Sequence, residues 1–94
     1  MAQSMEVAET LALSVLCWIV THENLLPAFL GSTGASVDDI KAQATDRAFL
    51  GTVLEFLTSD DTWVVDFCDV HGVDYEQPML AAQVLLGTAR THWT

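Results

Sequence analysis

Apolar residues recur along this chain at spacings of three and four, and short groups of Gly, Asp, Ser and Pro separate the runs. Residues three and four apart lie on the same side of an α-helix, so each run predicts a helix with a buried face. The β-branched stretches are too short and too interrupted to predict strands. We therefore predict an all-α fold, a compact orthogonal bundle of five to six short helices, as a single helical domain over 1–94.

The predicted helices are separated by Gly, Pro and capping residues. Their ranges are 4–21, 24–32, 37–44, 47–57 and 61–71, with a sixth helix that begins after Asp74 and ends at Gly87. Gly51 lies inside the fourth range, where it weakens the helix, and the close approach of another helix would explain it. Residues 88–94 show no periodicity and are predicted to form a C-terminal tail.

Capping residues mark the ends of these helices. Ser36, Asp46 and Asp60 stand at predicted N-caps, and Gly34 and Gly72 stand where helices end. Thirteen acidic residues against three basic ones give a net charge of −10. Most of these acids lie near a predicted helix start, where they oppose the helix dipole. The acid excess therefore supports the helical prediction.

The same charge limits the partners of the chain. A net charge of −10 would repel the phosphates of nucleic acid, and no polybasic segment is present to bind a membrane surface. The apolar segment 11–20 is about half as long as a membrane span needs. It follows Glu6 and Glu9 rather than the basic residues of a signal peptide. We expect no nucleic acid and no membrane partner, and we expect this segment to be a buried core helix.

Two cysteines, Cys17 and Cys68, lie inside apolar runs. We expect two buried, reduced thiols that act as small hydrophobic residues, because a disulfide framework needs more cysteines. A reactive thiolate would need a basic setting or a helix N-terminus, and the sequence around each cysteine offers neither. Reduced thiols favour a cytoplasmic location.

Two segments have an alternative interpretation as functional motifs. Residues 24–44 have the layout of a helix-turn-helix, but the second helix opens with Asp38 and Asp39, which would repel DNA. His22 and Glu23 could form an acid–base pair, but a junction between two helices explains both residues. Neither segment therefore predicts a DNA-binding site or a catalytic site.

A third candidate is the group of Asp66, Asp69, His71 and Asp74. Its spacing matches neither a calcium-binding loop nor a zinc motif. A solvated polar face with a histidine at the helix end explains it. We predict no catalytic residue, no cofactor-binding residue and no metal ligand, and we expect that the chain is not an enzyme.

Four residues are candidate contacts with a protein partner: Trp63, Asp66, Asp69 and Trp93. Asp66 and Asp69 lie on one helix face and cap no predicted helix. Trp93 lies in the aperiodic tail, where it either packs back on the bundle or offers an anchor to a partner. The helix at 61–71 has more apolar positions than one face can bury, so it is either central or a seam between two copies. A monomer and a weak homodimer both remain open.

Several short motifs are spread along nearly the whole chain. They are ETLAL at 9–13, W at 18, FL at 29–30, TG at 33–34, FLGTVLEFL at 49–57, FC at 67–68 and HW at 92–93. This set resembles a family of small alphaproteobacterial proteins filed as a domain of unknown function. The resemblance implies a bacterial, cytoplasmic, all-helical domain and supplies no catalytic residue.

These features predict a non-enzymatic protein-interaction module. Its partner is an unidentified protein, and acidic rims favour one with a basic surface. An alternative is an acidic mimic of nucleic acid that inhibits a basic DNA- or RNA-binding protein. A third option is an enzyme that depends on a metal or a small molecule.

Overall fold

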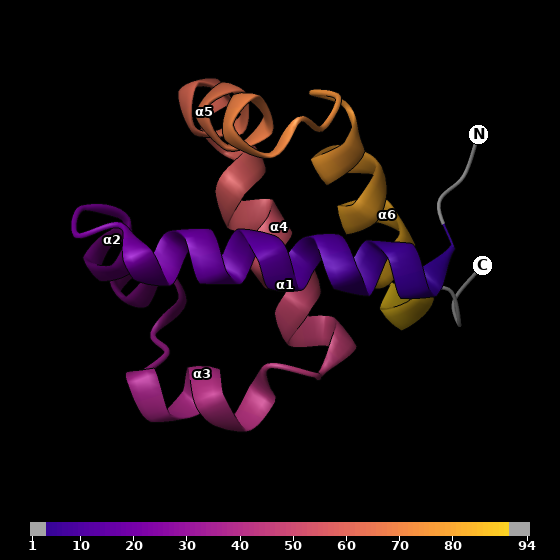
Figure 1. The fold of residues 1–94 in the computed structure, drawn as a ribbon. Helices are drawn as coiled ribbons and strands as arrows, with labels where there is room; N and C mark the ends of the chain where they lie inside the picture. Colours follow the sequence, from indigo (N-terminus) through magenta and orange to yellow (C-terminus); the bar gives the residue numbers. More distant parts are fainter. Residues whose placement is uncertain (1–3, 91–94) are drawn as a thin grey trace.

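Three helices form the centre of the molecule: α1 (Met5–Thr21), α4 (Arg47–Thr58) and α6 (Gln77–Arg90). The computed structural model describes residues 4–90, with the side chains of residues 4–87. In Figure 1, α1 runs across the front of the molecule, and α4 and α6 lie behind it. Each of the three helices contacts the other two, and the most extensive pairing is that of α4 with α6.

Three shorter helices surround this centre: α2 (Leu25–Thr33), α3 (Val37–Gln43) and α5 (Asp61–His71). α2 packs on α1 and α4, and α5 packs on α4. Each pair that includes α3 has fewer contacts than any of these pairs. α3 and α5 lie at opposite ends of α4 (Figure 1). Residues 4–90 contain six helices and no strand. The predicted all-α bundle is confirmed.

The N-caps predicted at Ser36, Asp46 and Asp60 are present, whereas the sixth helix begins at Gln77 and not directly after Asp74. The Ser36 hydroxyl accepts a hydrogen bond from the backbone N–H of Asp39 at 3.1 Å, and the Asp39 carboxylate accepts one from the Ser36 N–H at 3.0 Å. These reciprocal bonds form a capping box at the start of α3. The carboxylates of Asp46 and Asp60 accept backbone N–H bonds in the first turns of α4 and α5, at 3.0 and 2.8 Å. Side chains therefore satisfy amides that these helices leave without an internal partner.

Two of the predicted helix ends are confirmed and one is wrong. Gly34 and Gly72 follow α2 and α5 with φ of 74° and 65°, in the left-handed region that favours glycine. The last helix does not end at Gly87, because α6 continues to Arg90. The first residues of the predicted tail therefore belong to that helix.

Small residues of α4 and α6 lie in the core beside large apolar side chains. The buried residues of α6 include Ala81 and Ala82, and Gly51 of α4 is buried opposite that helix. Small residues at this contact let the two backbones approach each other, which confirms the explanation predicted for Gly51. The largest fully buried side chains elsewhere are Phe29, Phe67, Ile19, Leu50, Leu54 and Leu57.

Several side chains predicted to be buried are exposed. Cys17 is exposed, and so are Leu13 and Val20 on the same side of α1. α1 is apolar on nearly all sides, but its neighbours α2, α4 and α6 leave this side uncovered. Helical spacing also predicts that Val37 of α3 and Met79 of α6 are buried, but they are exposed by 49% and 51%.

No single helix among residues 4–90 is long and apolar enough to cross a membrane. α1 and α2 together have the length and composition of a span, but they meet at a bend of 115°.

Candidate functional site

The outer side of α5 holds two of the predicted partner contacts, Asp66 and Asp69. Both side chains are exposed and lie about one turn apart. Val65 and Val70 flank them and are exposed by 38% and 72%. With Tyr75, which is 55% exposed in the loop after α5, these residues form a surface that we call the acidic α5 face.

Tyr75 is attached to this face by a hydrogen bond. Its hydroxyl donates to Oδ1 of Asp69 at 2.7 Å. This bond, and then the charge of the same carboxylate, raises the pKa of Tyr75, because a phenolate would lose the bond and face a negative charge. The bond holds the Asp69 carboxylate and the Tyr75 ring next to each other at one margin of the face.

The sequence interpretation missed three members of this face. Val65 and Val70 are two of the apolar positions that the sequence places on the helix at 61–71 in excess of one buried face. Each lies four residues from one of the two aspartates and therefore on the same side. That spacing was the available signal. Tyr75 had no signal of this kind, because the turn that follows α5 determines its position.

Trp63, the third predicted contact, is half-buried at the contact between α5 and α4. Its ring stacks on that of Phe56, with centroids 4.8 Å apart and planes at 26°. Phe56 in turn packs edge-on against Phe29 of α2, at 5.2 Å. Trp63 therefore joins α5 to the core, and its ring is less exposed than the side chains of Asp66 and Asp69. The fourth predicted contact, Trp93, lies outside the described residues.

Cys68 lies on the buried side of α5 and is 1% exposed. Its Sγ donates to the backbone oxygen of Asp74 at 3.6 Å. Burial raises the pKa of the Cys68 thiol, and the negative charges of Asp69 and Asp74 raise it further. The predicted burial is confirmed for Cys68 and is wrong for Cys17, which is a free and exposed thiol.

The histidines at the ends of α1 and α5 have matching environments. Nδ1 of His22 lies 2.8 Å from the backbone oxygen of Trp18, and Nδ1 of His71 lies 3.1 Å from that of Phe67. Each imidazole also packs on the ring of the same residue, with centroids 4.4 and 4.2 Å apart. Both histidines thus bond to the last turn of their own helix. Within the described part of the chain, no three His, Cys, Asp or Glu side chains are grouped closely enough to hold a metal ion.

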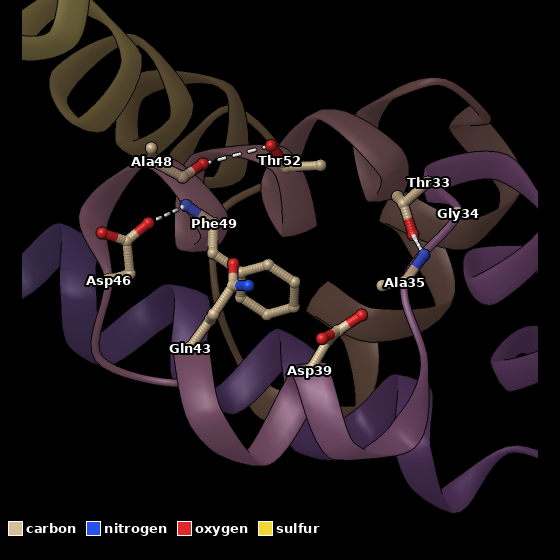
Figure 2. Close-up of a pocket in the computed structure, with 9 residues that line it drawn as sticks. All are labelled: Thr33, Gly34, Ala35, Asp39, Gln43, Asp46, Ala48, Phe49 and Thr52. Carbon is tan, nitrogen blue, oxygen red and sulfur yellow. Dashed lines mark hydrogen bonds between the residues drawn. The ribbon is translucent and has the colours of Figure 1, made fainter.

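A hollow of about 350 Å³ lies between the α2–α3 turn and the start of α4 (Figure 2). Its two carboxylates, Asp39 and Asp46, are the caps of α3 and α4. Thr33 accepts a hydrogen bond from the Ala35 N–H at 3.3 Å on the other side of the hollow. Each of these polar groups makes a bond that stabilises a helix end or a turn, so the geometry assigns them a structural role.

The same corner contains the predicted helix-turn-helix layout, α2 and α3 joined at Gly34. Asp38 and Asp39 lie in the first turn of α3, where the contacts of a recognition helix with phosphate would begin. Asp38 is exposed there, and α3 contributes one basic residue, Lys41, in its last turn. The structure thus places two acidic residues at the start of α3, and the expectation of no nucleic-acid partner stays a prediction.

The carboxylates are divided between distant parts of the surface. Asp38, Asp39 and Asp46 lie at the α3 end of α4, whereas Asp66 and Asp69 lie at its α5 end (Figure 1). A nucleic-acid mimic needs its carboxylates in one ordered array. The division into separate groups gives that alternative no support.

Comparison with known proteins supports a single assignment. Neither curated proteins nor solved structures provide a match to this chain. A family model described as "Protein of unknown function (DUF3572)" matches residues 5–88, which span all six helices up to the last turn of α6. The chain therefore belongs to the DUF3572 family.

Proposed function

We propose that this chain is a non-enzymatic protein-interaction module that binds a basic, partly apolar segment of another protein on the acidic α5 face. The observation that carries the proposal is the composition of that face, two exposed carboxylates flanked by two exposed valines. Residues 48–89 include no Lys or Arg that could neutralise it. A partner supplies the opposite charge.

The two kinds of side chain have different effects on binding. Val65 and Val70 offer apolar area that a partner can cover, and burial of such area stabilises a complex by about 25 cal/mol per Å². Asp66 and Asp69 steer a basic partner toward the face and select its orientation. An amphipathic helix with Lys or Arg beside aliphatic residues has both features.

The proposal also includes the location of the module in the cell. Two free thiols support a reducing compartment, and we place the protein in the bacterial cytoplasm. The carboxylates of Asp39 and Asp46 in the hollow already accept backbone hydrogen bonds, and Cys68 is buried. Both observations support a role without catalysis.

Affinity capture with matched variants tests the proposal. Immobilised wild-type chain is compared with Asp66→Lys/Val70→Ser, which changes the acidic α5 face. The matched control is Val37→Ser/Asp38→Lys, which changes an exposed valine and an exposed aspartate on α3 by the same charge. Proteins recovered from a cell extract are identified and quantified by mass spectrometry.

The expected result is at least one basic protein that the wild type and the α3 control retain and that the α5 variant loses. Retention of that protein should fall as salt is added, because screening weakens attraction between opposite charges. A set of captured proteins that is the same for all three versions would show that the acidic α5 face is not the binding site.

A further inference from the structure

A hollow of about 300 Å³ lies in the turn that joins α5 to α6. We call it the turn hollow, and the following residues line it: Cys68, Asp69, Gly72, Val73, Asp74 and Tyr75. The Val73 N–H donates to the Cys68 backbone oxygen at 3.0 Å, and Sγ of Cys68 donates to the Asp74 backbone oxygen at 3.6 Å. These bonds attach the turn to the end of α5, so the turn hollow is a formed part of the fold beside the acidic α5 face.

Two carboxylates supply negative charge to the turn hollow. The side chains of Asp69 and Asp74 are both exposed. After burial, the charges of these two carboxylates raise the pKa of the Cys68 thiol in the wall of the hollow, so both charges lie near that wall. Oδ1 of Asp69 accepts the bond from Tyr75, and no described residue donates a hydrogen bond to Oδ2. The turn hollow therefore has negative charge and an acceptor oxygen to offer a cation.

The described part of the chain brings no Lys or Arg to the turn hollow. Lys41 lies on α3, at the opposite end of α4 from α5 (Figure 1). Arg47 begins α4 at that same end, and its Nε donates to Oε2 of Glu9 at 2.8 Å. Arg90 ends α6, about 20 Å along the helix from Gln77 at 1.5 Å per residue. A Lys or Arg side chain that enters the turn hollow therefore comes from a partner.

The ring of Tyr75 gives the turn hollow a means to distinguish the two basic residues. The bond from its hydroxyl to Oδ1 of Asp69, at 2.7 Å, holds the ring beside the carboxylate, and the side chain is 55% exposed. A planar guanidinium can stack on an aromatic ring and direct its N–H groups at a carboxylate. An ammonium is a compact, strongly hydrated charge without a flat face. The pair of Tyr75 and Asp69 therefore matches arginine better than lysine.

We propose that the turn hollow binds an arginine side chain of the protein partner and selects it over lysine. The guanidinium stacks on the Tyr75 ring and donates to the carboxylate of Asp69, and the charge of Asp74 attracts it to the hollow. Val65 and Val70 contact aliphatic residues beside that arginine. This inference rests on the proposed binding of a basic segment to the acidic α5 face, and it specifies which residue of that segment the face selects.

NMR titrations with two synthetic peptides test the selection. Both peptides are blocked amphipathic helices with leucine along one side, and they differ only in whether the basic residues of the other side are arginine or lysine. Shifts of the backbone amides of Asp69 and Tyr75 in the isotope-labelled chain report binding and give a dissociation constant for each peptide. We expect the arginine peptide to bind about two- to fivefold more tightly, which is the effect of one exposed cation–π contact.

Tyr75→Leu removes the aromatic ring and keeps an apolar side chain at an exposed position. The two dissociation constants should become nearly equal in this variant. Asp66→Asn is the matched control, because it removes a carboxylate from the acidic α5 face outside the lining of the turn hollow. It should weaken the binding of both peptides and keep the ratio of their dissociation constants. Circular dichroism of both variants establishes that each is folded.

The ratio of the two dissociation constants separates selection from general attraction. A chain with a net charge of −10 attracts any cationic peptide, but that attraction is the same for two peptides of equal charge. Equal affinities of the wild type for both peptides would overturn the proposal. A preference for arginine that persists in Tyr75→Leu, or the absence of shifts at Asp69 and Tyr75, would overturn it as well.

The affinity capture described above fails independently of this titration. Capture of a basic protein through the acidic α5 face, together with equal affinities for the two peptides, would overturn only the selection of arginine at the turn hollow. A preference for arginine that requires Tyr75, without a captured protein that depends on the face, would support the guanidinium site and contradict the proposed protein partner.

Discussion

Gly51 of α4 lies directly against Leu86 of α6. A Cβ at position 51 would lie 2.7 Å from Cγ of Leu86, closer than real Cβ contacts, and 3.6 Å from Cβ of Leu85. Glycine inside a helix costs about 1 kcal/mol relative to alanine. Gly51 therefore destabilises α4 as an isolated helix. It also allows the close approach of α4 and α6, which form the most extensive helix pairing in the fold.

Gly51→Ala should therefore destabilise the protein although it improves the helix propensity of α4. Overpacking costs about 1–3 kcal/mol, and the gain in propensity offsets about 1 kcal/mol of it. We expect a net loss of about 1 kcal/mol in the free energy of unfolding, measured by urea denaturation.

Gly31→Ala is the control for this change. Gly31 lies inside α2, and a Cβ there would have no neighbour within 4 Å. This variant should gain stability, by up to about 1 kcal/mol. Equal effects of the two substitutions would contradict a close approach at Gly51.

The buried side of α6 is only partly predicted by the sequence. Helical spacing predicts that Met79 is buried, but it is exposed, whereas Ala81 and Ala82 are buried. Hydrophobicity favours the larger side chain, but the available space depends on the neighbouring helix. Periodicity within one helix carries no information about the distance to the neighbouring helix. The sequence therefore predicts the helix itself but only part of its buried side.

The cap of α4 offers a test of local stability. The Asp46 carboxylate accepts a hydrogen bond from the Phe49 N–H at 3.0 Å. Asp46→Ala should lower the free energy of unfolding by about 1 kcal/mol, whereas Asp46→Asn should retain most of the stability because Asn is an equally good N-cap. Urea denaturation measures both variants.

Asp66→Ala is the matched control for the cap. Asp66 is an exposed aspartate within α5 and caps no helix, so its removal should change the free energy of unfolding by less than about 0.5 kcal/mol. A loss as large as that of Asp46→Ala would show that general charge effects, and not the cap, stabilise α4.

Local signals were reliable in this chain and long-range ones were not. Ser36, Asp46 and Asp60 were identified from the residues beside them, because a cap depends on the next turn of its own helix. The exposure of Cys17 depends on which helices pack around α1, and no local pattern encodes that. The members of the acidic α5 face divide in the same way. The valines follow helical spacing, whereas Tyr75 reaches Asp69 through a turn.

The two thiols should react at very different rates. Cys17 is exposed, whereas Cys68 is buried and its pKa is raised by burial first and then by nearby carboxylates. Even a stability of about 5 kcal/mol leaves fewer than about one molecule in 1,000 unfolded, so Cys68 should react more than about a hundredfold more slowly. Alkylation of dilute protein by iodoacetamide, followed by intact mass, measures the two steps.

Cys17→Ser should remove the fast step and leave the slow one. Urea should then accelerate the alkylation of Cys68, because unfolding exposes the thiol and allows its pKa to return to the ordinary value. Rapid alkylation of Cys68 in the folded Cys17→Ser protein would contradict the burial of Cys68 on the inner side of α5.

The hydrogen bond from Tyr75 to Asp69 should be visible in a pH titration. The chain has one tyrosine, so the rise in ultraviolet absorbance that accompanies phenolate formation reports this residue alone. The bond and the charge of Asp69 raise the pKa of Tyr75 above its ordinary value of about 10. The folded state therefore holds the phenolic proton more tightly than the unfolded state does. The resulting stabilisation is fully present below about pH 10 and is lost as the pH rises through the folded pKa.

Asp69→Ala removes both causes and should return the titration midpoint toward that of a free tyrosine. Asp66→Ala is the control, because it removes a carboxylate from the same face without touching the bond. Its midpoint should stay close to that of the wild type. Identical midpoints in the wild type and Asp69→Ala would mean that Tyr75 is not bonded to Asp69, and the acidic α5 face would then lose the contact that attaches the tyrosine to it.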